Sequence, residues 1–104
     1  MLRRTSKFHV GQMVAHRRLG YRAVVVDADA VYRDTDAWCE VTEGQGARSE
    51  PWYRVLPDGA AHEAYLPERS LRADPQGERI RHPLLWLYFS EFRDGAYHLT
   101  KAAN

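Results

Sequence analysis

Apolar residues gather into short stretches along this chain, and the clearest of them lies near the N-terminus. An apolar segment at 13–16 leads into a turn at 19–21 and then into a run at 23–26 that ends in three consecutive valines. Because β-branched side chains lose rotamer freedom in a helix, the run predicts a buried strand. Gly20 can adopt positive φ at the tip of the turn. The pattern therefore predicts a hairpin over 13–26.

A second hairpin is expected over 52–66. Residues 51–56 are rich in aromatic and β-branched side chains, and 63–66 provide the returning strand. Between them, Pro57 presets φ and Gly59 accepts positive φ, which is typical of a tight turn. After the hairpin, 67–71 predicts one turn of helix and 74–77 a further loop.

The stretch at 34–50 separates the two hairpins and has few apolar residues. It contains Gly44, Gly46 and five acidic residues. The pattern predicts a long exposed loop. Loops of more than about 12–15 residues are uncommon unless they are functional or mobile.

The C-terminal stretch at 82–92 is rich in apolar residues and has a helical pattern. Apolar residues at 85, 88, 89 and 92 have the spacing of one helical face. Pro83 suits the first turn of a helix, and Gly95 lies where a C-terminal cap is expected. We therefore expect a C-terminal helix beginning near Pro83. Since its other faces are also apolar, the helix needs cover either from its own sheet or from a second subunit, which leaves a homo-oligomer open.

A length of 104 residues predicts one domain over 1–104 that can bury its own core. No stretch reaches the roughly 20 apolar residues of a membrane span, and the basic N-terminus is not followed by the apolar core of a signal peptide. Cys39 is the only cysteine in the sequence, so no internal disulfide can form. Together these features favour the cytoplasm.

The net charge of +1 conceals a segregation of charge. Residues 1–22 contain six Lys or Arg and no acid, whereas 27–50 contain seven acids and two Arg. Such asymmetry can focus a positive field on one face, as in nucleic-acid binders. The alternative is a solvated surface whose oppositely charged parts neutralise each other after folding.

Several motifs occur in a characteristic order: Gly-Gln-x-Val-x-His at 11–16, Leu-Gly-Tyr-Arg-x-Val-Val at 19–25, Asp-x-Asp at 27–29, Val-Tyr at 31–32, Pro-Trp-Tyr-x-Val at 51–55 and Tyr-Leu-x-Glu-x-x-Leu at 65–71. This order resembles the YccV-like, hemimethylated-DNA-binding family, whose bacterial members are called heat-shock protein HspQ. The resemblance covers about residues 7–97, and several ordered motifs are more specific than any single one.

The resemblance implies a mainly β fold, namely a small, strongly bent SH3-like β-barrel, here with a short C-terminal helix. It also implies a non-enzymatic stress-response protein with two family activities. One is binding of DNA that is methylated on one strand only. The other is assistance to an ATP-dependent protease, Lon, in degrading other proteins.

Residues with catalytic or metal-binding chemistry are scattered. The five histidines include no pair at i,i+4, and there is no cysteine pair, so neither a metal site nor a cofactor is expected. Asp27 and Asp29 point the same way if their strand persists. They could bind a cation or pair with Arg22 or Arg33, and pairing is the commoner outcome. We predict that the protein is not an enzyme.

Two functions remain open. A double-stranded DNA-binding module would use basic residues near the first turn, with one aromatic residue able to touch a groove or base: Lys7, Arg17, Arg18, Tyr21 and Arg22. Phosphate contacts supply affinity but carry no sequence or methylation information. A protein-binding adaptor, with an ATP-dependent protease as partner, would instead use exposed aromatic residues, for which the candidates are Trp52, Tyr53 and Trp86.

Overall fold

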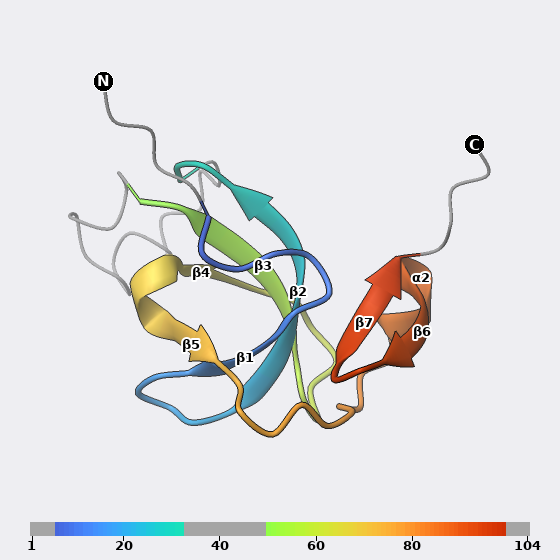
Figure 1. Cartoon of the computed structure of the whole chain (residues 1–104). Coiled ribbons are helices and arrows are strands. Elements are labelled where there is room, and N and C mark those ends of the chain that lie inside the picture. Colours follow the sequence, from blue (N-terminus) through green and yellow to red (C-terminus); the bar gives the residue numbers. More distant parts are fainter. Residues whose placement is uncertain (1–5, 33–49, 100–104) are drawn as a thin grey trace, which may run out of the picture.

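A computed structural model of the chain describes residues 6–32 and 50–99 (Figure 1). The expected loop at 34–50 lies outside these residues except for its last member. Seven strands, one short 3-10 helix and one short α-helix are described: β1 (Met13–His16), β2 (Arg22–Asp29), β3 (Trp52–Pro57), β4 (Ala64–Pro67), η2 (Glu68–Ser70), β5 (Leu71–Ala73), α2 (Leu85–Tyr88), β6 (Phe89–Arg93) and β7 (Ala96–Leu99). The protein is therefore mainly β, as expected.

Both predicted hairpins are confirmed. β1 pairs antiparallel with β2, and β3 pairs antiparallel with β4. Gly20 and Gly59 adopt the expected positive φ, at +82° each. The helical turn expected at 67–71 is η2.

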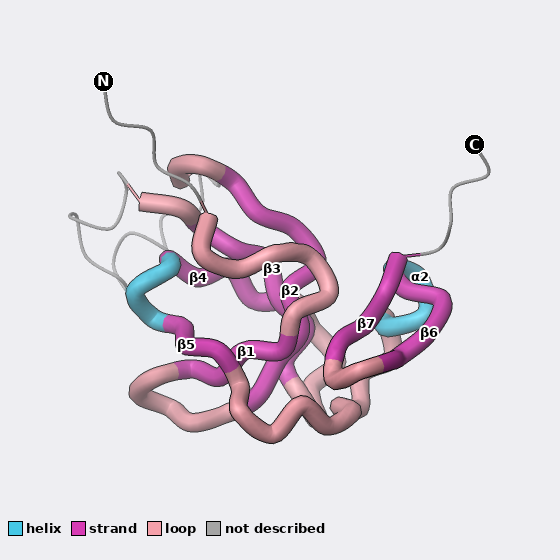
Figure 2. Tube along the Cα trace, viewed as in Figure 1, coloured by secondary structure: helices cyan, strands magenta, loops and turns pink. Residues whose placement is uncertain are grey.

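The five strands β1–β5 form one antiparallel sheet in the order β4-β3-β2-β1-β5 (Figures 1 and 2). A register shift between Val25 and Asp27 marks an irregularity in the pairing of β2 with β3, where an extra residue bends a strand. Among the described strands the order is open, with β4 and β5 at its edges, so no closed barrel is found.

The sheet is buried on both faces, which explains the uninterrupted apolar run in β2. Val25 belongs to a cluster on one face that draws residues from all five strands and from the segment before β1: Phe8, Val14, Ala23, Val25, Tyr53, Val55, Leu66 and Leu71. Val24 and Val26 belong to a cluster on the other face: Met13, Val24, Val26, Leu56, Ile80, Leu85, Phe89 and Tyr97. The second cluster joins the sheet to the C-terminal part of the chain.

The C-terminal prediction was only partly right. The α-helix begins close to Pro83 but ends at Tyr88, after a single turn, and the chain then forms the hairpin β6–β7. Asp94 and Gly95 occupy the two positions between the paired residues Arg93 and Ala96. Both have positive φ, 56° and 78°, which is the backbone of a two-residue hairpin turn. Gly95 is thus a turn residue and not a helix cap.

The unit formed by α2, β6 and β7, here called the C-terminal unit, is set apart from the five-stranded sheet in Figure 2. Its buried residues Leu85, Phe89 and Tyr97 connect it to the sheet through the second cluster. No helix in the described part of the chain has both the length and the hydrophobicity to span a membrane.

Candidate nucleic-acid interface

The turn between β1 and β2 presents two arginines to solvent. Its backbone is closed by His16 N donating to Tyr21 O at 2.8 Å and Gly20 N donating to His16 O at 2.9 Å. Arg17 and Arg18 lie between these contacts and are exposed. Within the described residues, neither guanidinium forms an ion pair. The turn therefore carries two cations that a phosphate can reach.

Arg17 also connects this turn to the edge strand β5. Its backbone N–H donates to Ser70 O at 2.8 Å, and its Nε donates to Leu71 O at 3.0 Å. Because an arginine has five N–H donors, this contact leaves others for a phosphate. The arginine turn is thereby held against the end of η2 and the beginning of β5 (Figure 1).

Lys7 approaches the same 3-10 helix from the N-terminal side. Its backbone N–H donates to Glu68 Oε2 at 2.8 Å, and the residue is exposed. Arg17 contacts Ser70, at the other end of η2. The fold thus brings together two predicted residues that are ten positions apart in the sequence.

Sequence reasoning missed two further arginines, Arg69 in η2 and Arg72 in β5. Both are exposed, and Arg72 lies opposite Ala15 of β1. Arg69 forms an ion pair with Glu50, with Nε and Oε2 3.4 Å apart. The missing information was the pairing of β1 with β5, which brings together residues more than 50 positions apart. We call the set Lys7, Arg17, Arg18, Arg69 and Arg72 the basic edge.

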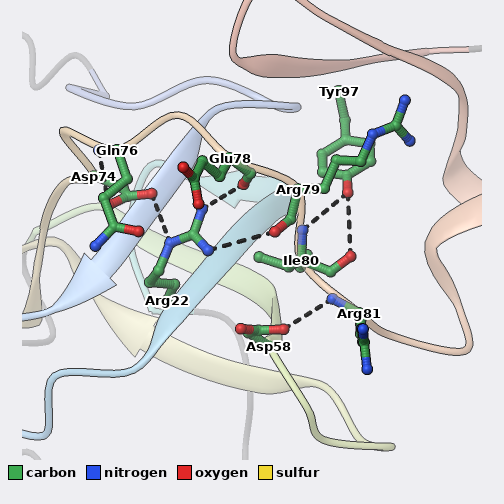
Figure 3. A network of polar contacts seen from close by, with 9 residues as sticks. All are labelled: Arg22, Asp58, Asp74, Gln76, Glu78, Arg79, Ile80, Arg81 and Tyr97. Carbon is green, nitrogen blue, oxygen red and sulfur yellow. Dashed lines mark hydrogen bonds and ion pairs between the residues drawn. The ribbon is translucent and has the colours of Figure 1, made fainter.

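Arg22 does not belong to this exposed set, although the sequence suggested it. Its Nε pairs with Asp74 Oδ2 at 2.8 Å, and its terminal nitrogens donate to the carbonyls of Glu78 and Arg79 (Figure 3). The side chains of Arg22 and Asp74 are 17% and 2% exposed. Arg22 therefore holds the segment that follows β5, and three of its five N–H donors are already used.

Tyr21 is only half-buried, but much of its ring is covered. The ring centroid lies 5.2 Å from that of His16, and the side chain packs against the first apolar cluster. Any contact with DNA would thus involve the part of the residue left outside this packing.

The two carboxylates of the Asp-x-Asp motif do not pair with Arg22, whose partner is Asp74. Asp29 Oδ2 accepts a hydrogen bond from the Tyr65 hydroxyl at 2.7 Å, and Asp27 Oδ1 accepts one from the backbone N–H of Ala28 at 2.9 Å. The other suggested partner, Arg33, lies outside the described residues. Within the described ranges, no group of three or more acidic, histidine or cysteine side chains is arranged to hold a metal ion.

Two of the three aromatic residues suggested for partner binding are buried. Trp52 is 1% exposed and Tyr53 is not exposed at all, so neither offers a ring to a partner. Trp86 is 56% exposed. It belongs to the C-terminal unit, where Leu87 and Leu99 are also exposed.

Two tyrosine hydroxyl groups connect segments that are distant in the sequence. The Tyr53 hydroxyl donates to Glu68 Oε2 at 2.6 Å and accepts from the N–H of Phe8 at 3.3 Å. Burial, followed by the hydrogen bond to Glu68, raises the pKa of Tyr53. In the C-terminal unit the Tyr88 hydroxyl donates to Glu63 Oε2 at 2.6 Å, and this bond raises the pKa of Tyr88.

Residues 6–96 match the model of the family described as hemimethylated DNA-binding protein YccV like. The chain belongs to this family. The match confirms the resemblance carried by the ordered motifs, and it covers both the whole five-stranded sheet and most of the C-terminal unit. In this YccV-like domain the turn that carries Arg17 and Arg18 lies inside the matched region. The family description names DNA binding and no reaction.

Proposed function

We propose that this chain is a non-enzymatic DNA-binding protein that contacts the phosphates of a duplex through its basic edge. The observation that carries the proposal is the arginine turn, where Arg17 and Arg18 are exposed and no described carboxylate pairs with either of them. Membership of a family described as hemimethylated-DNA-binding supports the choice of DNA as ligand. The proposal keeps the cytoplasmic localisation expected from the sequence.

The position of the basic edge supports contact with a backbone of regularly spaced charges. Arg17 and Arg18 occupy a turn, Arg72 an edge strand, and Lys7 the segment beside η2, so the cations come from separate elements on one border of the sheet. Since each neutralised phosphate releases condensed counterions, log K should fall with log salt by about 0.9 per contact. With few cations available, affinity should be modest.

Leu19 supports a contribution to methyl recognition. It is 65% exposed at the tip of the turn, directly after the two arginines. When the arginines bind phosphates, an apolar side chain at the tip can enter a groove and contact a methyl group. One such contact is worth roughly the 0.8 kcal/mol of a buried methylene, so the preference for hemimethylated over unmethylated DNA should be about fourfold.

The arrangement of the sheet also supports the finer fold proposal, a strongly bent SH3-like barrel. Four consecutive strands form a meander, and a 3-10 turn leads into β5, which returns to β1. Both edge strands contribute to the same apolar cluster, through Leu66 and Leu71. Amide exchange that protects β4 and β5 as strongly as β2 would support closure, whereas rapid exchange along both edges would contradict it.

The deciding experiment is a salt titration of DNA binding with two double variants of equal net charge. Arg17→Glu with Arg18→Glu reverses the charge of the turn, and Arg81→Glu with Arg93→Glu reverses two exposed arginines outside the basic edge. We expect the first variant to lose about 10- to 100-fold in affinity at low salt and the second to lose little. Equal losses would contradict the basic edge as the binding surface.

Binding to matched duplexes tests the methyl contact separately. Leu19→Ala should abolish the preference for hemimethylated over unmethylated DNA while the affinity for unmethylated DNA changes little. Val31→Ala, at another exposed apolar residue, is the matched control. A preference that survives in Leu19→Ala would assign methyl recognition to another residue.

A protein-binding adaptor is favoured by a different observation. Trp86, Leu87 and Leu99 are all more than half exposed on the C-terminal unit. Exposed apolar side chains of this kind are typical of protein contacts. If wild-type protein fails to bind DNA at low salt, this role takes precedence. Trp86→Ala should then weaken stimulation of an ATP-dependent protease of the Lon type.

A further inference from the structure

His16, the last residue of β1, holds the tip of the arginine turn. The residue is 4% exposed. Its ring Nδ1 accepts hydrogen bonds from the backbone N–H of Arg18 at 3.2 Å and from that of Leu19 at 3.0 Å. These two residues carry the cationic and apolar groups proposed to meet DNA. The position of both therefore depends on an acceptor atom in a buried ring.

A ring nitrogen accepts a hydrogen bond only while it carries no proton. Nδ1 of His16 must therefore be unprotonated, and the neutral ring carries its proton on Nε2. In the imidazolium form both nitrogens carry protons. Nδ1–H would then face the two backbone N–H groups, and both hydrogen bonds that position Arg18 and Leu19 would be lost, although the backbone hydrogen bonds that close the turn do not involve the ring.

We propose that His16 is a positioning residue for the basic edge, and that protonation of its ring loosens the arginine turn and weakens DNA binding. This inference rests on the proposed function. The inference goes beyond that function because it assigns a pH-dependent control of DNA binding to a residue that does not touch the DNA. Histidine is suited to this task because its charge changes close to neutral pH.

Charged groups lie on several described segments beside His16. The described segments beside His16 are the turn, the first half of β2, η2 and the stretch from β5 to Asp74, and their charged and titratable residues are Arg17, Arg18, Tyr21, Arg22, Glu68, Arg69, Arg72 and Asp74. The two carboxylates have other partners: Glu68 accepts from Tyr53 and Lys7, and Asp74 accepts from Arg22.

The sign of the effect separates this proposal from simple electrostatics. Protonation of exposed histidines adds positive charge, which should strengthen binding to DNA as the pH falls. Loosening of the turn predicts the opposite. We expect the affinity of the wild-type protein to fall about three- to tenfold between about pH 8 and about pH 5.5, a loss of the size of one or two ordinary hydrogen bonds.

The test variant is His16→Asn. Its Oδ1 is bonded to Cγ, as Nδ1 is in histidine, so it can accept the same two N–H groups and does not titrate. This variant should bind DNA as well as wild type at about pH 8 and should keep or increase its affinity at about pH 5.5. Equal pH profiles for wild type and His16→Asn would overturn the proposal.

Two further variants serve as controls. His9→Asn removes an exposed imidazole without changing the turn. His82→Asn changes the other histidine that is buried among the described residues, whose Nδ1 accepts the N–H of Leu84 at 3.1 Å directly before α2. Both variants should keep the wild-type loss of affinity at low pH. If His82→Asn removes that loss, the pH effect belongs to the whole fold and the proposal is overturned.

A measurement without DNA separates this inference from the proposed function. In an NMR titration of the wild-type protein, the amide resonances of Arg18 and Leu19 should shift with the same midpoint as the ring of His16, and they should not do so in His16→Asn. Amides that do not follow the ring overturn the proposal even if DNA binds. Amides that follow the ring in a protein that binds no DNA support control of the turn and overturn the proposed function.

Discussion

The five-stranded sheet and the C-terminal unit differ in how much of their surface is buried. In the sheet, β1 is buried along its whole length and apolar clusters cover both faces. In the C-terminal unit, only one side is buried, and Trp86, Leu87 and Leu99 remain exposed. Because a two-stranded sheet is only marginally stable alone, the C-terminal unit depends on its contact with the larger sheet.

Backbone hydrogen bonds add to the apolar cluster that joins the two regions. Gly11 N donates to Val25 O at 2.8 Å, and Tyr97 N donates to Gly11 O at 2.9 Å. The Tyr97 hydroxyl accepts the N–H of Ile80 at 3.1 Å (Figure 3). One glycine thus connects β2 with β7. Stability should therefore be most sensitive to this contact, less to the core of either region, and least to the exposed turn.

The largest effect should come from Gly11→Ala. A Cβ at this position would lie 2.1 Å from Tyr97 O, and the residue has a φ of +94°. The backbone of β7 must then move away, so we expect a loss of more than about 4 kcal/mol in the free energy of unfolding, measured in urea. Gly20→Ala is the control: φ is +82° but no atom lies within 4 Å of the added Cβ, so about 1 kcal/mol should be lost. Equal losses would show that the contact is not tight.

The next largest effect concerns the buried side of the C-terminal unit. Phe89 is 1% exposed and packs in the cluster shared with the sheet, whereas Leu87 is 77% exposed. Phe89→Ala should cost about 3–4 kcal/mol, and Leu87→Ala should change stability by less than about 0.5 kcal/mol. Urea denaturation measures both. A large loss in Leu87→Ala would mean that its side chain is covered, for example in an oligomer.

Arg22 and Arg72 allow a comparison within the sheet. Both lie opposite Ala15, on the two neighbouring strands, but Arg22 is bonded to Asp74 and two carbonyls while Arg72 is exposed. Arg22→Ala leaves the carboxylate of Asp74 buried without its partner, so we expect a loss of about 2 kcal/mol. Arg72→Ala should change stability little and should weaken DNA binding. If Arg72→Ala lost more stability than Arg22→Ala, and Arg22→Ala lost more DNA affinity, the assignment of the two arginines would be wrong.

The smallest effect should be a pH dependence from Tyr53. Its pKa is raised in the folded state by burial and by Glu68, so the folded protein holds this proton more tightly than the unfolded chain does. The resulting stabilisation is complete below about pH 10 and is lost as the pH rises through the folded-state pKa. Tyr53→Phe should lose about 1 kcal/mol near neutral pH and should show a shallower alkaline decline. Equally steep declines would assign the effect to another group, such as Tyr88.

Local patterns predicted the sheet well. The valines of β2, Gly20 and the Pro-Asp-Gly turn each specify their conformation within a few residues, and the structure confirms both hairpins. The C-terminal prediction was wrong beyond Tyr88, although the sequence contained a competing signal. Asp94-Gly95 is a strong two-residue hairpin pair, and the helical spacing of the apolar residues was given more weight. The spacing of these apolar residues is also compatible with the observed structure, because one helical turn followed by a strand buries both Leu85 and Phe89.

The candidate site was predicted only where it is local. The exposure of Arg17 and Arg18 could be predicted because the local sequence pattern indicates a turn at these residues. The family could be predicted because its motifs occur in order along the sequence. The sequence alone thus determined the hairpins, their turns and the family. Only the tertiary structure decided that β5 pairs with β1, which brings Arg69 and Arg72 to the basic edge. The tertiary structure also decided that Asp74 forms the ion pair with Arg22. It likewise decided that Trp52 and Tyr53 are buried. These outcomes depend on pairing between distant segments, and no short-range preference of the chain encodes which distant strand will be the partner.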